Sequence, residues 1–98
     1  MERRFSERKT LNIDTTLIAG NLFYSGTVLN ISEKGMSICS KIRFPDDSVL
    51  VVIIRKKIMV IARVKWAKQK NSHYYTIGVE LLNPLQDYLE LVNSLRSA

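Results

Sequence analysis

Hydrophobic and polar residues alternate along most of this chain of 98 residues. The clearest run covers residues 58–66: Ile58, Val60, Ala62, Val64 and Trp66 fall on one face, and Met59, Ile61, Arg63 and Lys65 fall on the other. A period of two over this length predicts a β-strand that buries one face and exposes the other. This strand is the strongest structural signal in the sequence.

Further short strands are predicted on both sides of this run. They cover residues 9–18, 22–31, 36–40, 49–54 and 74–81. Glycine and asparagine in residues 19–21 predict a turn between the first two, because both tolerate positive φ. Ser25 and Gly26 predict a bulge in the second. Residues 49–54 are apolar throughout, which predicts a strand buried on both faces.

The connections between the later strands are polar. Pro45 and two aspartates mark residues 42–48 as a loop, residues 55–57 form a charged turn, and residues 67–72 form a hairpin loop.

A helix is predicted over residues 84–97. Asn83 is the predicted N-cap and Pro84 suits the first helical position. An apolar stripe follows at helical spacing, made of Leu85, Tyr88, Leu89, Val92 and Leu95. Six or seven short strands followed by one helix predict a mainly β fold, a small antiparallel β-barrel whose C-terminal α-helix covers part of the barrel or an open end.

Composition narrows the class of protein. The chain is long enough for one domain, and its hydrophobic fraction of 46% is that of a folded protein. The net charge of +6 favours an anionic partner, although such a charge also serves solubility. Cys39 is the single cysteine, so no disulfide can form within the chain, and the longest apolar run is too short for a membrane span. We therefore expect a cytoplasmic protein.

Three arginines lie close together near the N-terminus: Arg3, Arg4 and Arg8. A guanidinium group holds phosphate through two parallel hydrogen bonds and stacks on flat rings, so this segment is a candidate for binding nucleotides. Taken alone, a charged segment of this kind is more often a solvated, frayed chain end.

Two further motifs give the arginine segment a context. Arg4-x-x-x-Arg8, Asn30-x-Ser32-x-x-Gly35 and the strand from Ile77 to Glu80 together resemble the PilZ domain, a family of bacterial receptors for the second messenger cyclic di-GMP. The resemblance implies a flexible arginine switch in residues 1–10 and one PilZ-like barrel domain in residues 11–98. It implies a receptor or adaptor in signal transduction, in which the ligand orders the switch onto the barrel and alters the interaction with a partner protein.

The resemblance also implies a set of ligand-binding residues: Arg3, Arg4, Arg8, Asn30, Ser32, Gly35 and Trp66. The arginines would hold phosphates and stack on guanine. Asn30 and Ser32 would bind a base edge and a phosphate, Gly35 would allow close approach, and Trp66 would lie beside the ligand. The family often has aspartate where this chain has Asn30, which removes a charge that accepts strongly from guanine.

The residues themselves leave alternatives open at these positions. Asn30 and Ser32 commonly cap turns, Gly35 can serve the turn through positive φ, and a tryptophan that continues a buried face is usually a core residue.

Other functions are less compatible with the sequence. A PilZ-like module that binds only proteins remains the main alternative. DNA or RNA binding is not expected, because the adjacent pairs Phe23–Tyr24 and Tyr74–Tyr75 point to opposite faces and make no stacking platform. One histidine, one cysteine and no convergent carboxylate pair predict no enzyme, no metal and no cofactor.

Overall fold

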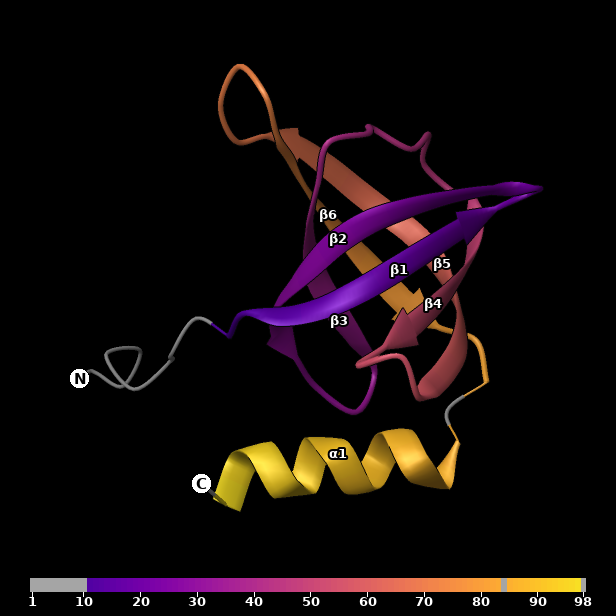
Figure 1. Ribbon diagram of the computed structural model, residues 1–98, viewed down its shortest axis with the longest axis vertical. Helices are drawn as coiled ribbons and strands as arrows, with labels where there is room; N and C mark the ends of the chain where they lie inside the picture. Colours follow the sequence, from indigo (N-terminus) through magenta and orange to yellow (C-terminus); the bar gives the residue numbers. More distant parts are fainter. Residues whose placement is uncertain (1–10, 84, 98) are drawn as a thin grey trace.

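A computed structural model describes residues 11–83 and 85–97, which form a six-stranded barrel and one helix (Figure 1). The strands are β1 (Ile13–Ala19), β2 (Leu22–Ile31), β3 (Gly35–Ser40), β4 (Val49–Ile54), β5 (Ile58–Gln69) and β6 (Tyr75–Leu81). All neighbours are antiparallel, in the order β1-β2-β3-β6-β5-β4, and pairing of β1 with β4 closes the barrel. The predicted mainly β barrel is confirmed, with six strands.

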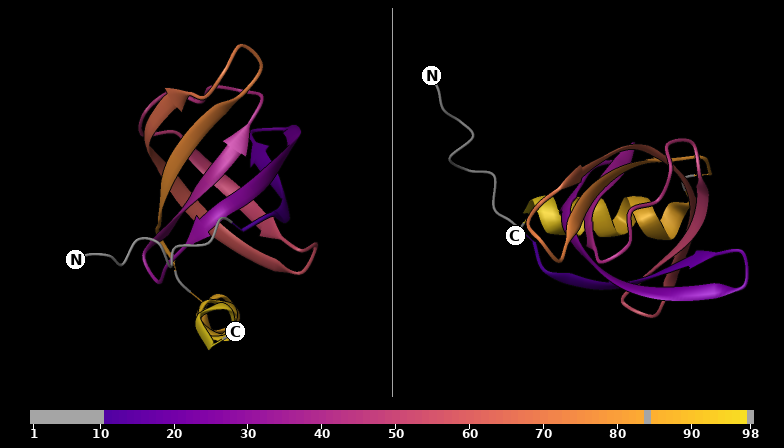
Figure 2. Two further views of the ribbon diagram at one scale, coloured as in Figure 1. Left: turned by 90° about the vertical axis from the view of Figure 1, so that its left-hand side faces the viewer. Right: turned by 90° about the horizontal axis from the view of Figure 1, so that it is seen from above.

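The core fills the barrel and continues onto the helix. Alternate side chains of β3, β4 and β5 point inward and are buried. The helix α1 (Gln86–Ser97) lies across one end of the barrel (Figure 1; Figure 2). At the opposite end, Phe44 from the loop after β3 is buried and packs edge-on against Tyr24, with 5.5 Å between ring centroids. The prediction that the helix covers an open end is confirmed.

The helix begins later than its sequence suggested. Pro84 lies outside the described residues, and α1 starts at Gln86, with the Leu89 N–H donating to the Leu85 carbonyl. The prediction of Asn83 as N-cap is wrong: its side-chain oxygen accepts a hydrogen bond of 2.9 Å from the Ile61 N–H. Ile61 lies beyond the end of β6, where its N–H would otherwise lack a strand partner.

The buried face of α1 also differs in part from the predicted stripe. Tyr88, Leu91 and Val92 are buried, whereas Leu85 is exposed. Leu85 precedes the first turn of α1, so it lies off the face that packs on the barrel.

Two strands differ from prediction in burial or length. Strand β4 buries Leu50, Val52 and Ile54, but Val49 on its outer face is 53% exposed, so burial on both faces is wrong. The reason is that α1 covers an end of the barrel and leaves the wall uncovered. Strand β5 continues through Gln69, because Gln69 still pairs with Tyr75, and the hairpin loop is shorter than predicted.

The bulge predicted at Ser25-Gly26 is also wrong. Both residues pair regularly with β1, opposite Thr16 and Thr15. A side chain on Gly26 would crowd the Ile38 side chain and the Cys39 carbonyl oxygen at 3.1–3.2 Å, so Gly26 serves close packing. The irregular pairings fall elsewhere, at Leu29 in β2 and at Lys65 in β5.

The charged turn between β4 and β5 is confirmed, and its backbone is strained. Arg55 and Lys56 have φ values of 56° and 61°, and the Lys57 N–H donates to the Ile54 carbonyl at 3.0 Å. Two consecutive residues with positive φ make the hairpin turn that normally selects Asn-Gly. Arginine and lysine lack the local hydrogen bonding or the missing side chain that relieves this conformation.

Replacing this pair by Arg55→Asn with Lys56→Gly should therefore stabilise the barrel. We expect the free energy of unfolding to rise by about 1 kcal/mol, the strain relief being partly offset by the greater freedom of glycine in the unfolded chain. Urea denaturation followed by circular dichroism measures this change. Lys57→Gly, at a position with ordinary φ, is the matched control and should not stabilise; equal stability of the double variant and the wild type would contradict the prediction.

Candidate functional site

Four residues on the outer wall of the barrel lie in one row across four strands. Asn30 of β2 pairs with Ser37 of β3, Ser37 pairs with Gly78 of β6, and Gly78 pairs with Trp66 of β5. We call these four residues the outer row. With neighbouring strands about 4.8 Å apart, the row spans about 14 Å from Asn30 to Trp66. Its ends are a carboxamide and an indole, and its middle residues are small.

Both ends of the outer row face outward because of bulges. The pairing of β2 with β3 shifts between Val28 and Asn30, and the pairing of β5 with β6 shifts between Val64 and Trp66. Val28 and Val64 are fully buried, so strict alternation would bury Asn30 and Trp66 as well. One extra residue in each strand turns the following side chain to the opposite face. The predicted placement of Trp66 on the inward face with Val64 is therefore wrong.

The Trp66 indole packs against Gly78 of the neighbouring strand β6. A Cβ atom on Gly78 would overlap the indole ring, so the absence of a side chain there makes room for it. The indole remains 41% exposed, and the Lys68 ammonium lies 5.8 Å from its centroid. Trp66 thus offers an aromatic surface with a cation beside it, a pairing that favours flat, electron-rich or anionic ligands.

The turn that follows Asn30 is held by local hydrogen bonds. The Ser32 N–H donates to the Gly35 carbonyl at 2.9 Å. The Ser32 hydroxyl donates to the same carbonyl at 3.4 Å and accepts from the Lys34 N–H at 3.3 Å. Ser32 therefore caps its turn, but both side-chain bonds are long and weak, and the hydroxyl is exposed.

Unlike Ser32, Asn30 does not use its side chain in the hydrogen bonds of this turn. Its side chain is exposed and forms no hydrogen bond within the described ranges 11–83 and 85–97.

Gly35 has a scaffold role in this turn. It does not adopt positive φ, which among the described glycines occurs only at Gly20, so that expectation is wrong. A Cβ on Gly35 would overlap the Val79 carbonyl oxygen of the paired strand β6. Glycine is needed here because β3 and β6 approach closely.

The described part of the chain begins beside the outer row. Arg3, Arg4 and Arg8 lie outside the described residues, as does the predicted switch of residues 1–10. The first described residue, Leu11, donates its N–H to the carbonyl of the bulged residue Leu29 at 2.8 Å. The chain therefore enters the barrel one residue away from Asn30.

Several residues around the site were not found from the sequence. Ser37 and Lys68 carry no motif, and only the strand register brings them to the outer row. Tyr88 was predicted as part of the apolar stripe of the helix, yet its hydroxyl hydrogen-bonds the turn between β2 and β3. No sequence signal distinguishes a tyrosine that reaches a partner from one that is merely packed.

The charges near the outer row are mostly positive. Lys65 pairs with Glu80 at 3.7 Å, and both side chains are about half exposed, so the pair is weak. Lys34 and Lys68 are exposed on either side. Such a surface attracts anions.

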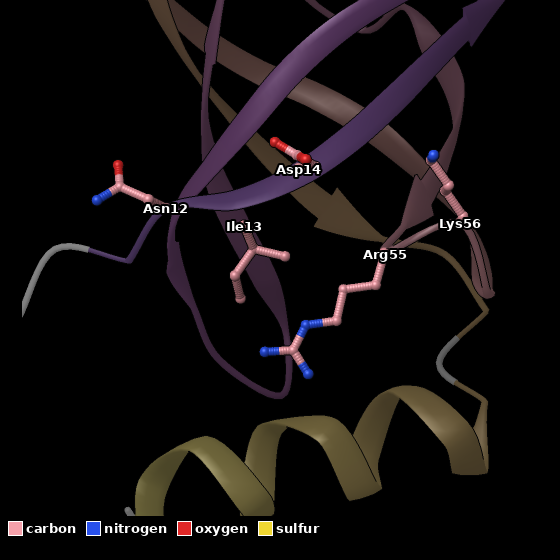
Figure 3. Close-up of a pocket in the computed structure, with 5 residues that line it drawn as sticks. All are labelled: Asn12, Ile13, Asp14, Arg55 and Lys56. Atoms are coloured by element: carbon pink, nitrogen blue, oxygen red, sulfur yellow. The ribbon is translucent and has the colours of Figure 1, made fainter.

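A separate hollow of about 350 Å³ opens between the start of β1 and the β4–β5 turn. It is lined by Asn12, Ile13, Asp14, Arg55 and Lys56, and Arg55 extends toward α1 (Figure 3). Of the residues predicted for ligand binding, those that the structure describes (Asn30, Ser32, Gly35 and Trp66) do not line it. Because Asp14 lies beside the two cations, the hollow does not form a simple anion site.

The described part of the chain shows neither a metal site nor a membrane-spanning helix. No cluster of three histidine, cysteine or acidic side chains occurs among residues 11–83 and 85–97. The helix described here is too short to cross a bilayer.

A small closed barrel with an exposed polar and aromatic row defines a binding domain. The family model of the PilZ domain matches residues 2–96, nearly the whole chain, and the chain belongs to this family. PilZ is a family of binding and adaptor domains of the cyclic di-GMP-binding type, and it is not an enzyme family. Comparison with curated proteins and with solved structures gave no significant match.

The contact between Trp66 and Gly78 can be tested by substitution. Gly78→Ala should displace the indole and lower the free energy of unfolding by about 1–3 kcal/mol, as overpacking does. Trp66 is the only tryptophan, so its fluorescence should shift at the same time.

The matched control is the same change without the indole. In a Trp66→Ala background, Gly78→Ala should be neutral or slightly stabilising, since alanine suits a strand better than glycine. An equal loss of stability in both backgrounds would show that the ring contact is not the cause.

Proposed function

We propose that this PilZ domain is a receptor for cyclic di-GMP that acts by binding alone. The observation that carries the proposal is the outer row, with a free Asn30 side chain at one end and an exposed Trp66 at the other. The arginine segment joins the barrel directly beside it.

The chemistry of the row suits a cyclic dinucleotide. Such a ligand presents two guanine bases with flat faces and two phosphates. Trp66 offers a stacking surface, and the Asn30 carboxamide can both donate to and accept from a guanine edge. Ser32 adds a hydroxyl group, which gives up only weak local hydrogen bonds when it turns toward the ligand.

The arginine segment is close enough to take part. Only Lys9 and Thr10 separate Arg8 from Leu11, a distance of at most about 11 Å in extended chain. Arg8 can therefore reach the Asn30 end of the row, and Arg4 and Arg3 can reach further across it. Each guanidinium–phosphate bond contributes about 1.5–3 kcal/mol, enough to order a short segment.

The output of binding would be a new surface. Residues 1–10, ordered over the ligand, would form a surface that a partner protein recognises, which is a common way to convert ligand binding into signalling. No catalytic step, metal or cofactor is part of this proposal.

The alternative is a protein-interaction module that does not bind nucleotide. Exposed apolar side chains on the far wall are compatible with it: Phe23 is 69% exposed, Met59 55% and Val49 53%. None of these three side chains belongs to the outer row, so protein binding there would not need the outer row.

Isothermal titration calorimetry with cyclic di-GMP tests the proposal. The wild type should bind, and Arg4→Ala, Arg8→Ala, Ser32→Ala and Trp66→Ala should each raise Kd, the arginine variants by about 10- to 100-fold. Cyclic di-AMP should bind more weakly, because adenine presents a different edge to Asn30.

Arg43→Ala is the matched control. Arg43 is exposed in the loop between β3 and β4 and belongs neither to the outer row nor to the N-terminal segment, so its loss should leave Kd unchanged. Absence of heat with the wild type would reject the receptor function, and specific binding of a protein by the same sample would then support the alternative.

A further inference from the structure

Tyr88 connects the C-terminal helix to the turn that carries Ser32. The side chain is completely buried between α1 and the barrel. Its hydroxyl lies 2.6 Å from the Ser32 carbonyl oxygen and 3.1 Å from the Gly35 carbonyl oxygen. Burial raises the pKa of the hydroxyl above its ordinary value, so Tyr88 stays protonated and donates.

The two carbonyls belong to the two ends of one turn. The Ser32 N–H also donates to the Gly35 carbonyl, which closes the turn on itself. The Tyr88 hydroxyl oxygen lies closer to the Ser32 oxygen than to the Gly35 oxygen, and this shorter bond restrains the plane of the peptide that follows Ser32. A helix residue 56 positions away thus contributes a hydrogen bond to the backbone of the turn.

The orientation of this backbone matters for the side chains that face the ligand. The Ser32 carbonyl points inward to Tyr88, while the Ser32 side chain is exposed on the outside. The local bonds of the Ser32 hydroxyl, at 3.3–3.4 Å, are too weak to hold the turn by themselves. From outside its own hairpin, the turn is held by the Leu81 N–H of β6, which donates to the Lys34 carbonyl at 2.9 Å, and by the Tyr88 hydroxyl, which donates to the Ser32 carbonyl at 2.6 Å.

We propose that Tyr88 is a positioning residue for the ligand-binding turn: its hydroxyl holds the backbone of residues 32–35 in the orientation that binds cyclic di-GMP. This inference rests on the proposed function for its ligand. It adds a helix residue to a site otherwise made of strands and the N-terminal segment.

The coupling acts in both directions. If the Tyr88 bond favours the turn conformation that binds ligand, bound ligand must favour the Tyr88 bond by the same factor. Ligand binding on the outer wall then strengthens the docking of α1 at the end of the barrel. The docking of the helix on the barrel then depends on the ligand.

Tyr88→Phe tests the inference, because it removes the hydroxyl and keeps the ring that packs in the core. We expect Kd for cyclic di-GMP to rise about 5- to 20-fold, as for the loss of one good hydrogen bond. In the ligand-free protein, the NMR amide signals of residues 32–35 should shift. Hydrogen exchange in α1 should slow on ligand addition in the wild type and change less in Tyr88→Phe.

Tyr24→Phe is the matched control. Tyr24 also packs against the core, through its contact with Phe44, and its hydroxyl forms no hydrogen bond with residues 11–83 or 85–97. Its loss should leave Kd and the amide signals of residues 32–35 unchanged.

Two outcomes would overturn the inference: a Tyr88→Phe protein that is less stable but binds with the wild-type Kd, or one whose signals from residues 32–35 do not move. Failure of the wild type to bind cyclic di-GMP would reject the proposed function instead. The amide signals of the ligand-free protein would then decide by themselves whether Tyr88 positions the turn.

Discussion

Two extra residues, Leu29 in β2 and Lys65 in β5, determine what the wall of this barrel presents. Each sits at a register shift, and each is followed by a residue that would otherwise point inward. Without the bulges, an asparagine would be buried without a hydrogen-bond partner, at a cost of about 1–3 kcal/mol, and the indole would have to fit into a filled core. The bulge at Leu29 also leaves a carbonyl oxygen that accepts a hydrogen bond from the Leu11 N–H, so the first described residue of the chain lies beside the Asn30 end of the outer row.

How well the sequence predicts the fold depends on how far apart in the chain the interacting residues lie. Alternation in residues 58–64 reports burial directly, and β5 follows it. Where the structure depends on pairing between strands that are distant in the chain, the pattern of hydrophobic and polar residues does not predict it. The bulge was expected at Gly26, where the sequence is locally unusual, and it lies at Leu29 and Lys65, where the sequence is ordinary. Asn83 was expected to cap its own helix, and it instead satisfies a strand N–H 22 positions away.

The candidate site was predictable to the extent that its motif is local. Asn30 and Ser32 were implied by the resemblance of their motif to the PilZ domain, and both are exposed near the hydrogen bond between Leu11 and Leu29. Ser37 and Gly78 became part of the site only through the register of β3 and β6. Tyr88 shows the limit most clearly: its helical spacing predicted burial, which is confirmed, but not the hydroxyl bond that makes it relevant to the turn.

The glycines of these motifs also stabilise the barrel, and this affects how substitutions at their positions should be interpreted. Gly35 allows β3 to approach the Val79 carbonyl, and Gly78 makes room for Trp66. A substitution at either glycine would disturb the barrel before any ligand is added, so a loss of binding there would not identify a ligand contact. The Asn30 side chain has no such structural role among the described residues, and the Ser32 side chain forms only weak local hydrogen bonds. Their side chains can be removed at little expected cost to the fold, so loss of binding at these two positions would identify recognition of the ligand.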